Sequence, residues 1–139
     1  MAKNLTLIAC VDDAMGMTFN GKRQCKDRVM RERLLSRLDG VRLWMSEYSA
    51  RLYGEAEGVC AHASYARRAK NGEAMLAEDS VPSLRGVDTV ILYKWNERYL
   101  ADTFFPYDLG REGFVLAETA DFVGSSHERI TEEIYKRLK

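Results

Sequence analysis

Apolar and polar segments alternate along most of the chain, in a pattern typical of strands separated by helices. Residues 5–11 (LTLIACV) and 87–95 (VDTVILYKW) are the strongest apolar runs. Nearly continuous runs of this kind predict strands covered on both faces, inside a mainly parallel sheet. Shorter apolar runs predict further strands at residues 41–46, 59–63 and 73–78.

Three segments between these runs have helical patterns. Residues 26–38 carry an apolar stripe at helical spacing. Residues 47–54 lie between two predicted strands and end in Gly, and residues 64–72 begin with Ser and end in Asn-Gly. Strands that alternate with helices in this way predict an α/β fold with crossover helices.

The C-terminal third predicts antiparallel strands, with one conflict. Residues 99–108 and 113–122 have strand patterns, whereas residues 128–137 follow a capping-box pattern, in which Ser125 lies three residues before Glu128. Local spacing alone would predict a helix there. Tertiary pairing often overrides such local preferences.

Length and charge limit the classes of function. A chain of 139 residues is long enough for one core and too short for two ordinary domains. Lys plus Arg and Asp plus Glu number 21 each, so net charge draws the protein neither to nucleic acid nor to an anionic membrane. No apolar run approaches the roughly 20 residues of a membrane helix. We expect one domain over residues 1–139, without nucleic-acid or membrane partners.

The Cys and His content excludes two kinds of site. Cys10, Cys25 and Cys60 are odd in number and lack C-x-x-C spacing, and His62 and His127 are the sole histidines. Neither a disulfide framework nor a zinc site is expected from this pattern. The cytoplasm is the compartment that such cysteines favour.

Several strings, taken in order, resemble the dihydrofolate reductase family. Residues 7–27 (LIACVDDAMGMTFNGKRQCKD) are similar to the family's first strand and mobile loop, here with Met15 and Gly16, and to the acidic residue at the start of its first long helix, here Asp27. Residues 42–54 (RLWMSEYSARLYG) resemble the strand, turn and helix that follow. The resemblance implies a single α/β domain with a mixed central sheet and flanking helices.

The C-terminal half carries the resemblance further. Residues 89–108 (TVILYKWNERYLADTFFPYD) contain the family's Asp-Thr-x-Phe-Pro signature. Because the family ends in a long antiparallel hairpin, the resemblance places residues 128–137 in its last strand, and we therefore expect a strand there.

The resemblance implies an NADPH site whose phosphate contacts are altered. The family's Gly-Arg-x-Thr turn falls on residues 46–49, with Glu47 in place of the Arg and Ser49 in place of the Thr. Its Gly-Gly phosphate cradle falls on Glu78 and Asp79. Carboxylates repel phosphates, and their side chains block the close approach that Gly permits. We expect NADPH binding to be lost or altered, and a magnesium or calcium ion between these acids is the alternative.

On the substrate side, the resemblance implies that Asp27 holds a pterin-like ring, with burial raising its pKa for proton relay. The alternative is that Asp27 complements the dipole of its helix. Tyr93 falls where the family has a Thr that supports this acid. Asp12, Asn20 and Arg23 complete the expected small-molecule cleft, although a turn role for Asp12 and a solvated loop around Arg23 are the alternatives.

Three functions follow from these observations. The first is a divergent dihydrofolate-reductase-like protein that keeps a small-molecule cleft without the usual NADPH site. The second is an active folate or pterin reductase that uses NADH or a flavin. The third is a non-enzymatic interaction module, with a homodimer as one form, on the same scaffold.

Overall fold

The structure is a computed structural model that describes residues 4–54 and 56–138. Along the chain, its elements are β1 (Leu5–Val11), β2 (Gly16–Phe19), β3 (Lys22–Arg23), α1 (Arg28–Arg37), β4 (Leu43–Met45), α2 (Glu47–Tyr53), β5 (Val59–Ala61), α3 (Tyr65–Arg68), β6 (Ala74–Leu76), β7 (Val87–Lys94), β8 (Thr103–Phe104), β9 (Phe114–Phe122) and β10 (Ile130–Arg137).

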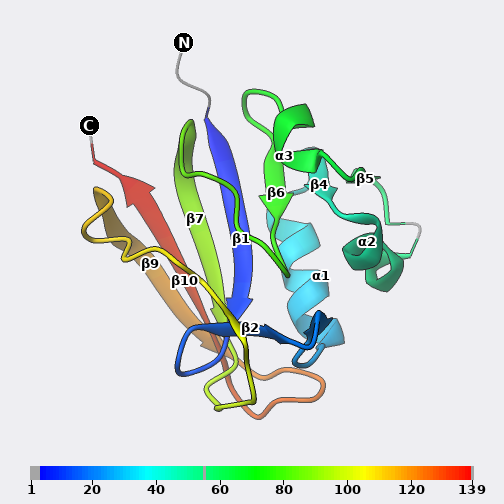
Figure 1. The fold of residues 1–139 in the computed structure, drawn as a ribbon, viewed down its shortest axis with the longest axis vertical. Helices are drawn as coiled ribbons and strands as arrows, with labels where there is room; N and C mark the ends of the chain where they lie inside the picture. Colours follow the sequence, from blue (N-terminus) through cyan, green and yellow to red (C-terminus); the bar gives the residue numbers. More distant parts are fainter. Residues whose placement is uncertain (1–3, 55, 139) are drawn as a thin grey trace.

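Within the described residues, seven strands form one sheet in the order β5-β4-β6-β1-β7-β10-β9 (Figure 1). The strands from β5 to β7 in this order run parallel, and β10 is antiparallel to both β7 and β9. A small sheet of β3, β2 and β8 lies beside the large one. The expected α/β fold, with a mixed central sheet and an antiparallel C-terminal hairpin, is confirmed.

Strand β1 lies inside the sheet and is covered on both faces. Leu7 belongs to an apolar cluster that includes Tyr65 of α3, whereas Ile8 belongs to a second cluster with Met30 and Leu34 of α1. Because successive side chains of a strand point to opposite faces, both faces of β1 must be apolar. This explains the uninterrupted apolar run in the sequence. In the described part of the chain, no helix has the length and apolar character needed to cross a bilayer.

Most predicted elements are present, with shorter bounds. The clearest difference is at residues 99–108, where the strand pattern predicted a continuous strand and only Thr103–Phe104 is one. Pro106 has no N–H to donate to a sheet, and this segment pairs only with the short strand β2. The rest of it therefore runs as an irregular connection.

The conflict at residues 128–137 is resolved in favour of a strand. β10 pairs along its length with β7 and β9, and its exposure alternates between buried and less buried positions. Ser125 does not cap a helix of its own. Its Oγ accepts a hydrogen bond from the backbone nitrogen of Arg28, at 2.9 Å, and so it supports the start of α1 from a distant part of the chain.

Replacing Gly124 with Ala tests how closely the β9–β10 turn (residues 123–129) approaches α1. A Cβ atom at Gly124 would lie 2.7 Å from Ile130 Cδ1 and closer still to the carboxylate of Asp27. We expect Gly124→Ala to lower the free energy of unfolding by about 1–3 kcal/mol. Gly110→Ala is the matched control, since its Cβ would meet nothing nearer than 3.5 Å. Urea unfolding measures both, and equal stability of the two variants would contradict the packing described.

Candidate functional site

The carboxyl ends of β1 and β6 meet at one edge of the sheet, beside the β2–β3 hairpin. Parallel α/β sheets bind their ligands at this edge. A cavity of about 20 Å³ lies there, which is room for about one water molecule. We name it the central cleft, and it is lined by Cys10, Met17, Arg23, Gln24, Cys25, Lys26, Met30, Leu52, Tyr53, Ala77, Glu78 and Trp95.

An ion pair closes the central cleft between the β2–β3 hairpin and the end of β6. Arg23 donates from Nε and Nη2 to the two oxygens of Glu78, each at 2.9 Å. The guanidinium lies over the ring of Tyr48, 4.3 Å from its centroid. Ser49 Oγ donates to Glu78 Oε1 at 2.7 Å. We name this arrangement the Arg23–Glu78 latch, and it raises the pKa of Arg23 mainly through the hydrogen bonds to Glu78.

Asp12 is buried and anchors the loop that follows β1. Its carboxylate accepts hydrogen bonds from the backbone nitrogens of Ala14, Gly16 and Tyr99 and from Nε2 of Gln24, at 2.7–3.1 Å. Burial alone would raise the pKa of Asp12, but these four donors overcome it and lower the pKa. The carboxylate is thus fully engaged inside the protein.

Asp27 is equally engaged. It accepts hydrogen bonds at 2.8–3.0 Å from the backbone nitrogens of Met30, Ser125 and Ser126. Ser126 Oγ lies 3.2 Å from Oδ2, and His127 Nδ1 lies 3.0 Å from it. Burial would raise the pKa of this carboxyl, but the donors of α1 and of the β9–β10 turn outweigh burial and lower the pKa. The direction is opposite to the raised pKa expected for a proton relay.

Tyr93 is buried and is not among the residues that line the central cleft. Its hydroxyl donates to Glu132 Oε2 at 2.8 Å. Glu132 also accepts from Arg33 Nη2 at 3.1 Å and from Arg37 Nε at 2.7 Å. Burial would raise the pKa of Glu132, and the donors of Arg37, Arg33 and Tyr93 hold it at about 2.

The remaining predicted residues lie near the protein surface. Asn20 is exposed in the β2–β3 turn, where its backbone nitrogen donates to Asp102 Oδ2 at 3.1 Å. Glu47 opens α2 and Asp79 follows β6, and both are exposed. Of the predicted site, the structure therefore brings together Arg23, Ser49 and Glu78. The binding roles of the whole set stay predictions.

Some cleft residues escaped the sequence analysis. Cys10, Tyr53 and Gln24 line the cleft, and the buried Oε1 of Gln24 has no hydrogen-bond partner within residues 4–54 and 56–138. The alternation within β1 could have indicated Cys10, because it shares a strand face with Ile8. Burial raises the pKa of Cys10, and it raises that of Cys25 to about 12, so neither thiol is activated as a nucleophile.

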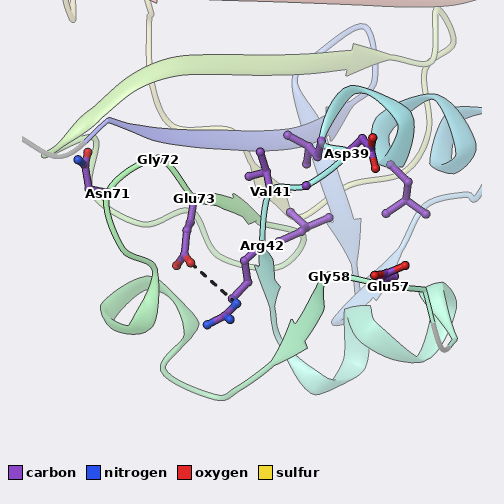
Figure 2. A pocket seen from close by; sticks show the side chains of 12 residues that line it. Asp39, Val41, Arg42, Glu57, Gly58, Asn71, Gly72 and Glu73 are labelled. Atoms are coloured by element: carbon purple, nitrogen blue, oxygen red, sulfur yellow. Dashed lines mark ion pairs between the residues drawn. The ribbon is translucent and has the colours of Figure 1, made fainter.

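A larger cavity of about 640 Å³ lies at the opposite end of the sheet, where β4, β5 and β6 begin (Figure 2). Figure 2 shows Arg42 and Glu73 pointing toward one another, with 3.9 Å between Nε and Oε2. Glu73 also accepts hydrogen bonds from Trp44 Nε1 and from the backbone nitrogen of Lys70. This carboxylate is committed to the local fold, and we place the candidate site at the central cleft.

The alternative at Glu47, Glu78 and Asp79 was a bound metal ion, and in the structure Glu78 has other partners. Glu78 is held by Arg23 and Ser49. Across residues 4–54 and 56–138, no group of three or more His, Cys, Asp or Glu side chains is placed to hold a metal ion.

The comparison with solved structures finds a similar fold. Neither the protein-family models nor the curated proteins give a match to this sequence. Among solved structures, the chain is similar to dihydrofolate reductase from Enterococcus faecalis complexed with NADP(H) and RAB-propyl. The TM-score is 0.69 and the match covers 100% of both chains, at 13% sequence identity. The chain therefore has a dihydrofolate-reductase-like fold, and a fold by itself does not establish a function.

The hydrogen bonds to Asp27 predict a stability that depends on pH. A carboxyl whose pKa is lower in the folded state stabilises the fold above its unfolded pKa, near 3.9, and loses this contribution as the pH falls. Asp27→Asn removes the charge and leaves buried donors unpaired, at a cost of about 1–3 kcal/mol for each such group. We expect the variant to be clearly less stable than the wild type at neutral pH, with the difference shrinking below about pH 4.

Urea unfolding across this pH range measures the effect, and Asp39→Asn is the control because Asp39 is exposed. If Asp27→Asn unfolds at the same urea concentration as the wild type at neutral pH, the structural role assigned to Asp27 is wrong.

Proposed function

We propose that this protein binds a small molecule in the central cleft and does not catalyse NADPH-dependent reduction. The observation that carries the proposal is the Arg23–Glu78 latch, whose two nitrogen–oxygen distances are both 2.9 Å. By resemblance, Glu78 stands where the family has a Gly beside the pyrophosphate of NADPH. A carboxylate that holds the neighbouring guanidinium leaves no free positive charge there for a phosphate.

The residues at both phosphate positions do not fit NADPH. Glu47 is the first residue of α2, and a negative side chain in the first turn of a helix disfavours an anion at that N-terminus. Glu78 and Asp79 replace the Gly-Gly cradle. Two like charges about 4 Å apart repel by about 4 kcal/mol at a surface-like dielectric. This charge pattern supports loss of the usual cofactor mode.

The residues at the expected substrate position also support loss of the reductase activity. Asp27 already accepts hydrogen bonds from two parts of the backbone, so it has little capacity left for the nitrogen atoms of a pterin ring. The open volume of the central cleft is about 20 Å³, whereas sites for drug-sized ligands measure about 300–1,000 Å³. A larger ligand can bind only if Arg23 moves.

One feature supports binding of a polar ligand rather than a sealed core. Gln24 lines the cleft, and its buried Oε1 has no hydrogen-bond partner among the residues that the structure describes. An unpaired buried acceptor costs about 1–3 kcal/mol. A ligand that brings a donor into the cleft would recover this energy, and so we favour a ligand with N–H or O–H groups.

An interaction module is the second candidate function. Edge strand β9 exposes Val115 and Leu116, at 43% and 48% of their surface. An exposed edge can pair with another strand. Glu118 and Asp121 lie on the same strand and place like charges against a second copy of the chain, which makes this the weaker candidate. Sedimentation of a monomer at micromolar concentration would argue against a homodimer.

The test of the proposed function is a thermal-shift titration with NADPH, NADH, FMN and dihydrofolate, followed by assays of nicotinamide oxidation. A ligand at 100 times its dissociation constant stabilises a fold by about 2.7 kcal/mol, a shift of several degrees for a domain of this size. We expect no shift with either nicotinamide and no oxidation in the presence of dihydrofolate.

The double variant Glu78→Gly, Asp79→Gly restores the family's Gly pair and frees Arg23. It should bind NADPH at least about tenfold more tightly than the wild type, which corresponds to about 1.4 kcal/mol. Saturable NADPH binding by the wild type, with oxidation of the cofactor by a pterin, would overturn the proposal and favour the reductase alternative.

A further inference from the structure

Arg23 occupies a site built for a planar cation. Glu78 accepts two hydrogen bonds from one edge of the guanidinium, and the ring of Tyr48 lies against its face at 4.3 Å. The carbonyl oxygen of Tyr48 lies 3.4 Å from Nη2. Two parallel hydrogen bonds and an aromatic face are the contacts that select guanidinium and amidinium groups over an ammonium point charge.

The surroundings of this site favour a cation over the phosphate that the resemblance would place there. Ser49 is buried and directs its hydroxyl hydrogen at Glu78, which orients the carboxylate. Gln24 also lines the cleft, and its side-chain amide donates to Asp12 Oδ2 rather than into the Glu78 site. The carboxylate of Glu78, the carbonyl oxygen of Tyr48 and the face of its ring therefore converge on the guanidinium, where an anion would require N–H donors.

Arg23 is delivered to this site by a short arm. It is the last residue of β3, a strand of two residues that pairs with β2 alone. The arm turns at Asn20 and Gly21, whose φ angles are 53° and 75°, values that match a two-residue hairpin turn of the primed type. Two hydrogen bonds also hold the arm, from Asn20 N to Asp102 Oδ2 and from Arg23 N to Tyr48 Oη, each at 3.1 Å. Neither involves a strand of the seven-stranded sheet, and so release of the Arg23 side chain leaves the pairing of that sheet unchanged.

We propose that Arg23 acts as an internal stand-in for the ligand, and that the central cleft binds a small molecule bearing a guanidinium or amidinium group, which replaces Arg23 on Glu78. The inference rests on the proposed function, since it names the ligand class of the same cleft. A tethered group competes at an effective concentration on the order of millimolar. The wild type therefore binds a free cation much more weakly than a variant without the Arg23 side chain.

The test uses benzamidine and methylguanidinium as probes, in isothermal titration with four forms of the full chain: wild type, Arg23→Ala, Arg23→Ala with Glu78→Gln, and Arg23→Ala with Asp79→Asn. We expect Arg23→Ala to bind benzamidine saturably and at least about tenfold more tightly than the wild type. Glu78→Gln in that background should abolish binding. Asp79→Asn removes the same charge one residue away, and binding should survive it.

Two results overturn the inference: no saturable binding of either probe by Arg23→Ala, or equal binding by Arg23→Ala with and without Glu78→Gln. Arg23→Met, which keeps the apolar stem, repeats the test if Arg23→Ala does not fold, as judged by circular dichroism. Nicotinamide titrations of the wild type distinguish failure of the proposed function from failure of the proposed ligand class. Binding of NADPH would overturn the proposed function. If neither NADPH nor the amidinium probes bind, only the proposed ligand class is overturned.

Discussion

The carboxylate of Asp27 joins the start of α1 to the β9–β10 turn, and the position of the C-terminal hairpin depends on this link. Its partners Ser125 and Ser126 lie 98 and 99 residues away in the sequence. The same contact brings Ser125 to the first N–H of α1 and stacks His127 on Trp95, with ring centroids 4.5 Å apart. One buried carboxylate thus accepts hydrogen bonds from backbone N–H groups of a helix terminus and of a distant turn. Without it, these N–H groups would need water as their acceptor.

Glu132 imposes a second constraint, on the register of β10. It lies on the buried face of the strand between Ile130 and Ile134, where an unpaired carboxylate would be costly. Arg33 and Arg37 of α1 supply the compensating charge. A slip of one residue would turn every side chain of β10 to the other face and separate Glu132 from both arginines. We infer that this buried cluster specifies the pairing of β10 more than it adds to stability.

The acidic residues at and near the candidate site differ in the groups that hold them. Asp12 and Glu78 follow the carboxyl ends of the parallel strands β1 and β6, the edge at which α/β sheets bind ligands. Asp12 holds the loop after β1, and Asp27 holds the start of α1 to the β9–β10 turn. Glu78 differs from them because it accepts hydrogen bonds from the side chains of Arg23 on the short hairpin and of Ser49 in α2, whereas backbone nitrogens hold both aspartates. The proposed exchange of Arg23 for an external cation depends on this side-chain partner, and it distinguishes Glu78 from the two structural aspartates.

Periodicity in the sequence was sufficient to predict an α/β fold, its parallel strands and its first long helix, because an apolar face must be buried whatever its partner. Resemblance, rather than local spacing, predicted the strand over residues 128–137. The spacing of Ser125 and Glu128 is the same whether Ser125 caps a helix that follows it or, as here, accepts a hydrogen bond from the start of α1. The partners of polar groups were decided by tertiary structure alone. Asp27 was expected to hold a ligand and Tyr93 to support it, and these roles stay predictions; in the structure Asp27 accepts a hydrogen bond from Ser126 of the β9–β10 turn, and Tyr93 donates one to Glu132 of β10. A hydrogen bond depends on which strand ends converge in space, and no local pattern in the chain records that convergence.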